Sequence, residues 1–137
     1  MNISLLAVFV SGIAAMIIGM LWFGPLFGKK WMALSGVNQK DMEKAKKEGG
    51  SMGIAYLLQF IAALLTAYVL AMFVGFVGAK DAAGGAMVGF WVWLGFVATT
   101  NLGSILWERK SVALYLLKNG HVLVNFLVMG IILATIA

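Results

Sequence analysis

The chain contains no cysteine and only one histidine, one proline and five acidic residues among its 137 positions. The absence of cysteine excludes disulfide bonds, thiolate metal sites and a cysteine nucleophile. A lone histidine, His121, cannot build a closed zinc or haem site in a monomer, and the methionines are more simply packing residues than copper ligands. Because the sequence offers no nucleophile and base pair and no carboxylate pair, it predicts a protein that is not an enzyme and has neither cofactor nor metal site.

Charge is scarce as well: charged residues make up 11% of the chain and apolar residues 63%, and the mean hydropathy is +1.00. A water-soluble core of this size cannot hide so much apolar surface, so lipid must cover most of it. Four apolar runs lack both formal charge and the period-two alternation of barrel strands, and each is close to the length that a helix needs to cross a bilayer. The sequence therefore predicts a single all-α domain over residues 1–137, an integral membrane four-helix bundle. The predicted spans lie at about residues 3–25, 53–77, 82–106 and 119–137.

Nine of the ten basic residues lie in two short stretches, residues 29–47 and 109–118. The connection between the middle two runs carries only Lys80 and Asp81. By the positive-inside rule, both basic loops are expected in the cytoplasm and both termini outside, an arrangement that an even number of spans allows. Because the charge is confined to loops, anionic lipid headgroups are the expected partners and nucleic acid is not.

The longer basic loop, residues 26–52, is expected to contain a short helix at about residues 39–48. Asn38 can cap the start of this helix, and Gly49-Gly50 can end it. Lysines in its last turn agree with the helix macrodipole. The helix is either a surface element on an anionic leaflet or a solvated connector whose charge sets the topology.

The end of the first run combines Gly24 and Pro25 with aromatic and basic residues. Since proline lacks a backbone donor and clashes with the preceding turn, the first helix is expected to kink or end at Gly24-Pro25. Tryptophans and bases near the ends of the first and third runs are typical of residues at the headgroup level. The expected interface anchors are Trp22, Trp31, Trp107, Lys29, Lys30, Arg109 and Lys110.

The segments at the two basic ends resemble each other. Residues 26–34 line up with residues 106–114 through a leucine, an aromatic residue, two bases and a final Ala-Leu, and Gln59 then corresponds to Asn125. The two helical hairpins are thus either parallel repeats, as in many small transporters, or juxtamembrane segments with the same residue types.

Polar side chains inside the spans indicate a candidate pocket, because an amide without a partner is costly in hydrocarbon. Three amide side chains, those of Gln59, Asn101 and Asn125, lie on the order of 10 Å from the basic ends of their helices. They are therefore expected in one layer. The layer forms either a pocket open to the cytoplasm or a set of hydrogen bonds that join the helices. The candidate pocket residues are Gln59, Asn101, Asn125, His121, Thr100 and Ser104.

Small residues recur at four-residue spacing in two of the spans and predict close helix contacts there. Spacing alone does not distinguish contacts within one chain from contacts between two chains. A homo-oligomer and a membrane-protein partner are therefore both open interpretations. The two stripes are Ala7, Ser11, Ala15 and Gly19 in the first span, and Gly85, Gly89, Gly95, Thr99 and Gly103 in the third.

Three segments taken together are distinctive: residues 22–32, with WFGPLFGK followed by Trp31-Met32, residues 41–47, and residues 101–108. They resemble the bacterial domain of unknown function 1761 family, whose members are small four-span membrane proteins. The resemblance covers nearly the whole chain and supports the predicted architecture. It implies no activity, cofactor or catalytic residue.

The sequence as a whole predicts a multi-pass protein of the bacterial inner (cytoplasmic) membrane. The expected function is the binding or transport of a small solute by a self-associating protein, through a polar pocket that faces the cytoplasm. The alternative is an accessory or assembly subunit that docks onto a larger membrane complex through a stripe of small residues.

Overall fold

The computed structural model describes residues 3–36 and 51–136, and its regular elements there are all helical. The prediction of an all-α protein with four apolar helices of membrane-spanning length is confirmed. The short helix expected at residues 39–48 lies outside the described residues. Within the described residues, four helical stretches are long and apolar enough to cross a membrane: Leu5–Leu26, Gly53–Val77, Ala82–Leu106 and Val112–Thr135.

The first span is helix α1 (Leu5–Leu21) followed by a π-helical turn, η1 (Trp22–Leu26). The helix breaks at Gly24, where φ is −108° and ψ is −105°, next to the proline at position 25. A further helix, α2 (Gly28–Ser35), follows and ends at a left-handed glycine. The loop expected from residue 26 onward thus begins with a helix, because the break turns the chain without ending its helical run.

The second span, α4 (Ser51–Val77), ends at Gly78, whose φ of +77° is the left-handed conformation that favours glycine. Asp81 then caps α5 (Ala82–Trp93) by accepting a hydrogen bond from the Gly84 amide at 2.7 Å. The third span does not continue as one α-helix. It passes through a π-helical turn, η2 (Leu94–Ala98), and a 3₁₀ turn, η3 (Thr100–Leu102), before the short α6 (Gly103–Leu106).

The fourth span, α7 (Val112–Thr135), begins earlier than the predicted start at residue 119. Ser111 provides the N-cap, since its Oγ accepts a hydrogen bond from the Leu114 amide at 3.0 Å. Lys118 therefore lies inside the fourth span and not in the loop. Charge density suggested a loop at this position, but the capping serine decides where the helix begins.

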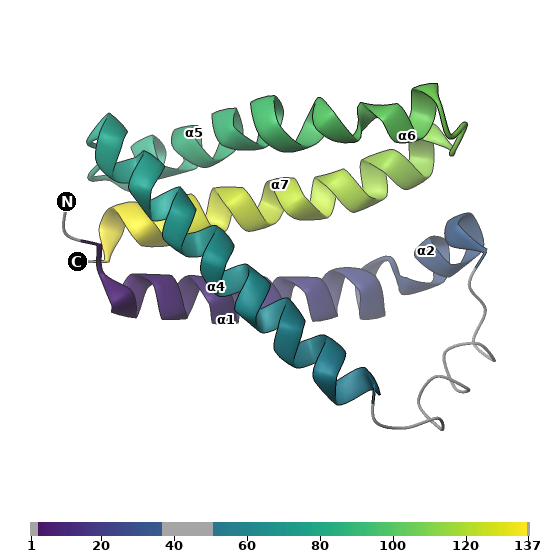
Figure 1. Ribbon diagram of the computed structural model, residues 1–137, viewed down its shortest axis with the longest axis horizontal. Helices are drawn as coiled ribbons and strands as arrows, with labels where there is room; N and C mark the ends of the chain where they lie inside the picture. Colours follow the sequence, from purple (N-terminus) through teal and green to yellow (C-terminus); the bar gives the residue numbers. More distant parts are fainter. Residues whose placement is uncertain (1–2, 37–50, 137) are drawn as a thin grey trace.

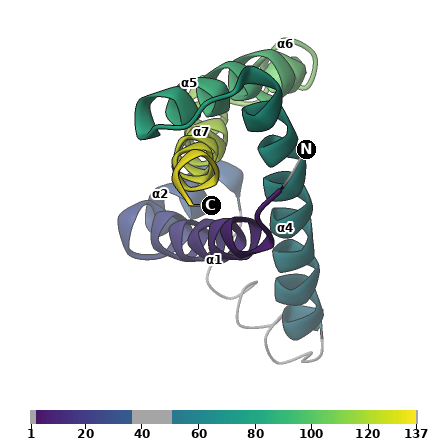
Figure 2. The ribbon, with the colours of Figure 1, turned by 90° about the vertical axis from the view of Figure 1, so that its left-hand side faces the viewer.

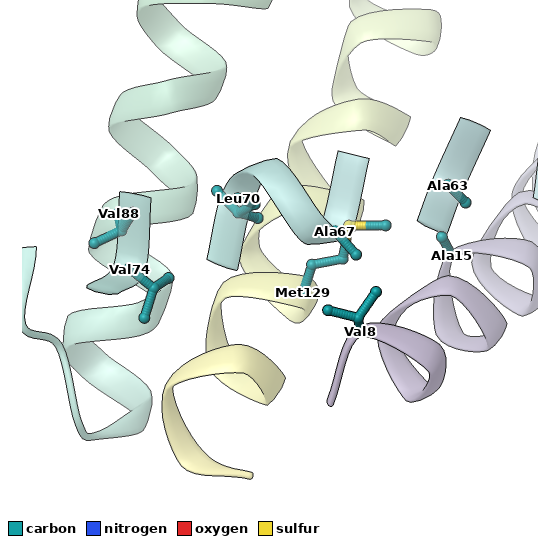
Figure 3. Packing of buried hydrophobic residues seen from close by; sticks show 8 residues of the cluster. All are labelled: Val8, Ala15, Ala63, Ala67, Leu70, Val74, Val88 and Met129. Atoms are coloured by element: carbon teal, nitrogen blue, oxygen red, sulfur yellow. The ribbon is translucent and has the colours of Figure 1, made fainter. Parts of the chain in front are cut away.

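Helices α1, α5 and α7 run along the long axis of the molecule, and α4 crosses them obliquely on one side (Figures 1 and 2). Both termini lie at one end of the bundle, and α2 and α6 lie at the other (Figure 1). The buried core is made of small and medium apolar side chains from all four spans (Figure 3). Its members are Val8, Ala15, Ala63, Ala67, Leu70, Val74, Val88 and Met129.

The closest helix contact joins α5 to α7 through glycines. A Cβ atom placed on Gly85 would lie 2.1 Å from the Gly130 carbonyl oxygen, and one placed on Gly89 would lie 2.2 Å from that of Phe126. On the first span, Ala7, Ser11 and Ala15 are buried. These parts of both small-residue stripes therefore pack against helices of the same chain.

Candidate functional site

A pocket of about 570 Å³ lies between the broken part of the third span and the first turns of α7. It is at the end of the bundle opposite the termini (Figure 1). Its apolar wall includes Trp107, Leu114 and Val122. Its polar wall consists of Thr100, Asn101, Ser104, Glu108, Lys110, Tyr115, Lys118 and Asn119.

Asn119 joins the two sides of this pocket and is only 5% exposed. Its Oδ1 accepts a hydrogen bond from Asn101 Nδ2 at 2.9 Å, and its own Nδ2 donates to the Tyr115 carbonyl at 3.0 Å. The Asn119 carbonyl in turn accepts from the Trp93 indole at 2.9 Å. Sequence reasoning missed this residue because it was taken as the first residue of the fourth span. A polar amide so near an apolar run was the signal that could have identified it.

Hydroxyl groups bond to backbone carbonyls of the broken part of the third span. Thr99 Oγ1 donates to the Gly95 carbonyl at 2.8 Å, and Thr100 Oγ1 donates to that of Phe96 at 2.7 Å. The Tyr115 hydroxyl of α7 donates to the Ala98 carbonyl. A helix can be broken at membrane depth only where such partners restore its hydrogen bonds, so the break and the pocket form one unit.

The charged residues of the pocket lie on its rim. Glu108 and Lys110 form an exposed ion pair with 3.7 Å between oxygen and nitrogen, a type that contributes little stability. Lys118 is also exposed, and no acidic residue of the described ranges pairs with it. The pocket therefore carries one lysine without a carboxylate partner from residues 3–36 or 51–136.

The expected layer of three amides is not what the structure contains. Asn101 lines the pocket together with the expected Thr100 and Ser104, whereas Gln59 is exposed on α4. Asn125 does not line the pocket: its Nδ2 lies 3.3 Å from His121 Nε2. The three amides therefore have different neighbours in the structure.

His121 and Asn125 form a second polar group, between α7 and the end of α1. The imidazole packs edge-on against Phe23, with 4.9 Å between ring centroids, and a Cβ on Gly19 would lie 3.4 Å from its Nε2. Asn125 Oδ1 and Ser11 Oγ are buried without a hydrogen-bond partner in the described structure. No group of three or more histidine and acidic side chains in residues 3–36 and 51–136 could hold a metal ion.

The expected interface anchors have different surroundings. Trp107 is 86% exposed, as suits a residue at the headgroup level, and the rings of Trp31 and Phe23 are 5.7 Å apart. Trp22 is not a surface anchor alone, because its indole donates to the Leu117 carbonyl of α7 at 3.0 Å. The four basic anchors, Lys29, Lys30, Arg109 and Lys110, are exposed.

Trp22 and Trp93 occupy equivalent positions in their spans. Each lies where an α-helix passes into a π-helical turn, each is followed two residues later by glycine, and each donates its indole N–H to a carbonyl of α7. The sequence alignment of residues 26–34 with residues 106–114 instead pairs a helix with a turn. The two hairpins therefore resemble each other most clearly when their Trp-x-Gly motifs are aligned.

We expect the indole hydrogen bonds to contribute to stability. Replacing Trp22 or Trp93 by phenylalanine keeps a ring but removes the donor, and each change should lower the free energy of unfolding by about 1 kcal/mol. Trp91→Phe is the matched control, since Trp91 is 60% exposed and contacts α5 neighbours. Unfolding in mixed micelles measures the difference, and an equal loss in the control would contradict the assignment.

Comparison with known proteins gives a family and no relative of known function. A family model described as "Protein of unknown function (DUF1761)" matches residues 6–134. No curated protein and no solved structure matches the chain.

Proposed function

The chain belongs to the DUF1761 family of proteins of unknown function, and we propose that this multi-pass membrane protein binds a small polar or amphipathic solute in the pocket beside α7. One observation carries the proposal: a pocket of about 570 Å³, lined by polar as well as apolar side chains, lies between two apolar spans. Polar side chains within a membrane span are costly unless they face water or a ligand or are hydrogen-bonded. Several pocket groups, including Lys118, are not fully used by the fold.

The role proposed is binding or passage and not chemical conversion. The hydroxyl groups of Thr100 and Tyr115 donate to backbone carbonyls, which are too weakly basic to remove the proton of a nucleophile. The imidazole of His121, the usual kind of base, is next to Asn125 and Phe23 and does not line the pocket. A bound solute would therefore meet recognition groups, and neither the Thr100 nor the Tyr115 hydroxyl would be activated as a nucleophile.

The orientation proposed has the pocket opening towards the cytoplasm, in the inner membrane of a bacterium. Lys29, Lys30, Arg109 and Lys110 belong to the elements at the pocket end of the bundle, opposite both termini (Figure 1). The positive-inside rule supports a cytoplasmic position for that end. The same basic residues are suited to contact anionic headgroups.

Cysteine labelling tests both the pocket and its orientation, since the natural chain has no cysteine. Thr100→Cys is expected to react with a membrane-impermeant thiol reagent in inside-out vesicles and not in intact cells. Ile61→Cys, at a 51% exposed position within the apolar α4, is the control that lipid should protect. Equal rates at the two positions would overturn the pocket, and reaction from the outer side only would overturn the orientation.

The alternative, an accessory or assembly subunit, is favoured by one remaining stripe. Gly95 and Thr99 are exposed, and a Cβ on Gly95 would have no heavy atom within 4 Å. Small residues that face lipid leave room for close approach of another helix, from a second copy or from a different membrane protein. Solute binding remains the leading proposal because it also accounts for the polar wall.

A further inference from the structure

Lys118 occupies an unusual place for a charged side chain. It lies within the span Val112–Thr135, about 9 Å from Val112 along the axis of α7 at about 1.5 Å per residue. A lysine at such depth normally marks a water-filled or ligand-binding site, or extends its ammonium to the interface. Here the residue lines the pocket, and no carboxylate of the described chain neutralises it.

The other polar groups of the pocket are largely committed as hydrogen-bond donors. The hydroxyl hydrogens of Thr100 and Tyr115 are directed to backbone carbonyls, and Asn101 donates to Asn119. The Lys118 ammonium has no carboxylate partner in the described chain, so it is the charged donor most available to a ligand, and the Ser104 hydroxyl lines the same pocket. An ammonium and a hydroxyl that line one pocket are matched by an oxyanion, such as a phosphate or a carboxylate.

The remaining wall of the pocket is apolar and continues into the span. Leu114, Lys118 and Val122 are spaced four residues apart, so they lie on one face of α7. Val122 is deeper in the span than Lys118, while the exposed indole of Trp107 lies in the connection that precedes α7. A ligand along this face would meet charge near the basic end and apolar surface towards the middle of the membrane.

We propose that the pocket recognises an amphiphile with a phosphate or carboxylate head, held by the Lys118 ammonium, and an apolar chain that lies along Val122. This inference rests on the proposed function and specifies its ligand class. The anionic amphiphile has two sources: a lipid of the surrounding leaflet, or a free amphiphile that enters from water. The net charge of the rim supports an anion, since Lys110 and Glu108 offset each other and Lys118 remains.

The test is protection of Thr100→Cys from a neutral, impermeant maleimide, in full-length protein reconstituted in phosphatidylcholine vesicles. Decyl phosphate at about nine times its dissociation constant is expected to slow labelling about tenfold, because only about a tenth of the pockets are then unoccupied. Inorganic phosphate and uncharged decyl maltoside should leave the rate unchanged at the same concentration. Protection in phosphatidylglycerol vesicles without added decyl phosphate would identify the leaflet lipid as a source, and its absence would identify the free amphiphile.

Variants separate recognition by Lys118 from general charge effects. Lys118→Gln should abolish protection by decyl phosphate, whereas Lys80→Gln should retain it, because Lys80 is an exposed lysine in the connection between α4 and α5. Protection that survives Lys118→Gln, or that decyl maltoside provides equally, would overturn the anionic head. Equal protection by inorganic phosphate would overturn the apolar chain.

The two proposals fail in different ways. If Thr100→Cys reacts readily but decyl phosphate never protects it, the water-accessible pocket stands and the anionic amphiphile is wrong. If Thr100→Cys reacts no faster than Ile61→Cys in the absence of any amphiphile, the pocket itself is wrong.

Discussion

Gly85→Ala is expected to disrupt the contact between α5 and α7 and to destabilise the bundle severely. The new methyl group would lie 2.1 Å from the carbonyl oxygen of Gly130, and a backbone atom in a helix cannot move away as a flexible side chain can. Overpacking against side chains typically costs 1–3 kcal/mol, so we expect a loss of about 3 kcal/mol or more here. Unfolding in mixed micelles measures the free energy directly.

A second glycine of the same helical stretch supplies the matched control. Gly95→Ala makes the identical chemical change where nothing lies within 4 Å of the new Cβ. Its effect on the free energy of unfolding should stay within about 1 kcal/mol and favour the helix. The packing assignment would be refuted if the two alanines proved equally costly or equally harmless. Gly130→Ala should reproduce the Gly85 result, because its Cβ would meet the Gly85 carbonyl at 2.1 Å.

Asn119→Leu is expected to have the next largest effect. The change removes the acceptor of Asn101 and the donor to the Tyr115 carbonyl, and it places a branched apolar side chain at a buried position. Leaving polar partners unpaired costs about 1–3 kcal/mol. The free energy of unfolding should therefore fall by an amount in that range.

Gln59→Leu is the corresponding control for Asn119→Leu. It also replaces an amide by leucine within a span, but Gln59 is exposed on α4. The change should therefore leave the free energy of unfolding in lipid unchanged or raise it. A double-mutant cycle of Asn119 with Asn101 should show a coupling of about 1 kcal/mol. Additive effects in that cycle would show that the hydrogen bond between the two amides contributes nothing.

Length and hydropathy were enough to predict the four spans, because lipid imposes one requirement on each: about 20 apolar residues with an internally bonded backbone. The break beside Pro25 also followed from local chemistry, since proline has no amide hydrogen to donate. The start of the fourth span was predicted wrongly. The charges of the segment indicated a loop, but a single capping residue, Ser111, determines where the helix begins.

The faces of the polar residues could not be predicted from depth alone. In an unbroken α-helix, Asn101 would lie about 120° around the axis from Gly89, which faces α7. The extra residue of the π-helical turn Leu94–Ala98 reduces this angle around the axis by about 100°. Asn101 is thereby directed towards Asn119. The residue types of that turn do not indicate that it contains an extra residue. The sequence therefore predicts that Asn101, Thr100 and Ser104 are polar wall residues more readily than it predicts their partners.

The exposed beginning of α4 has a consequence for the membrane itself. Each residue from Gly53 to Gln59 is exposed, and in Figure 1 the beginning of the helix diverges from the other spans. Where packing does not hold a helix, its tilt follows the match between its apolar length and the hydrocarbon thickness around it. A thinner bilayer would thus be accommodated by a greater inclination of α4, while the glycine contact between α5 and α7 stayed fixed. Hydrophobic mismatch would act on this protein first at α4.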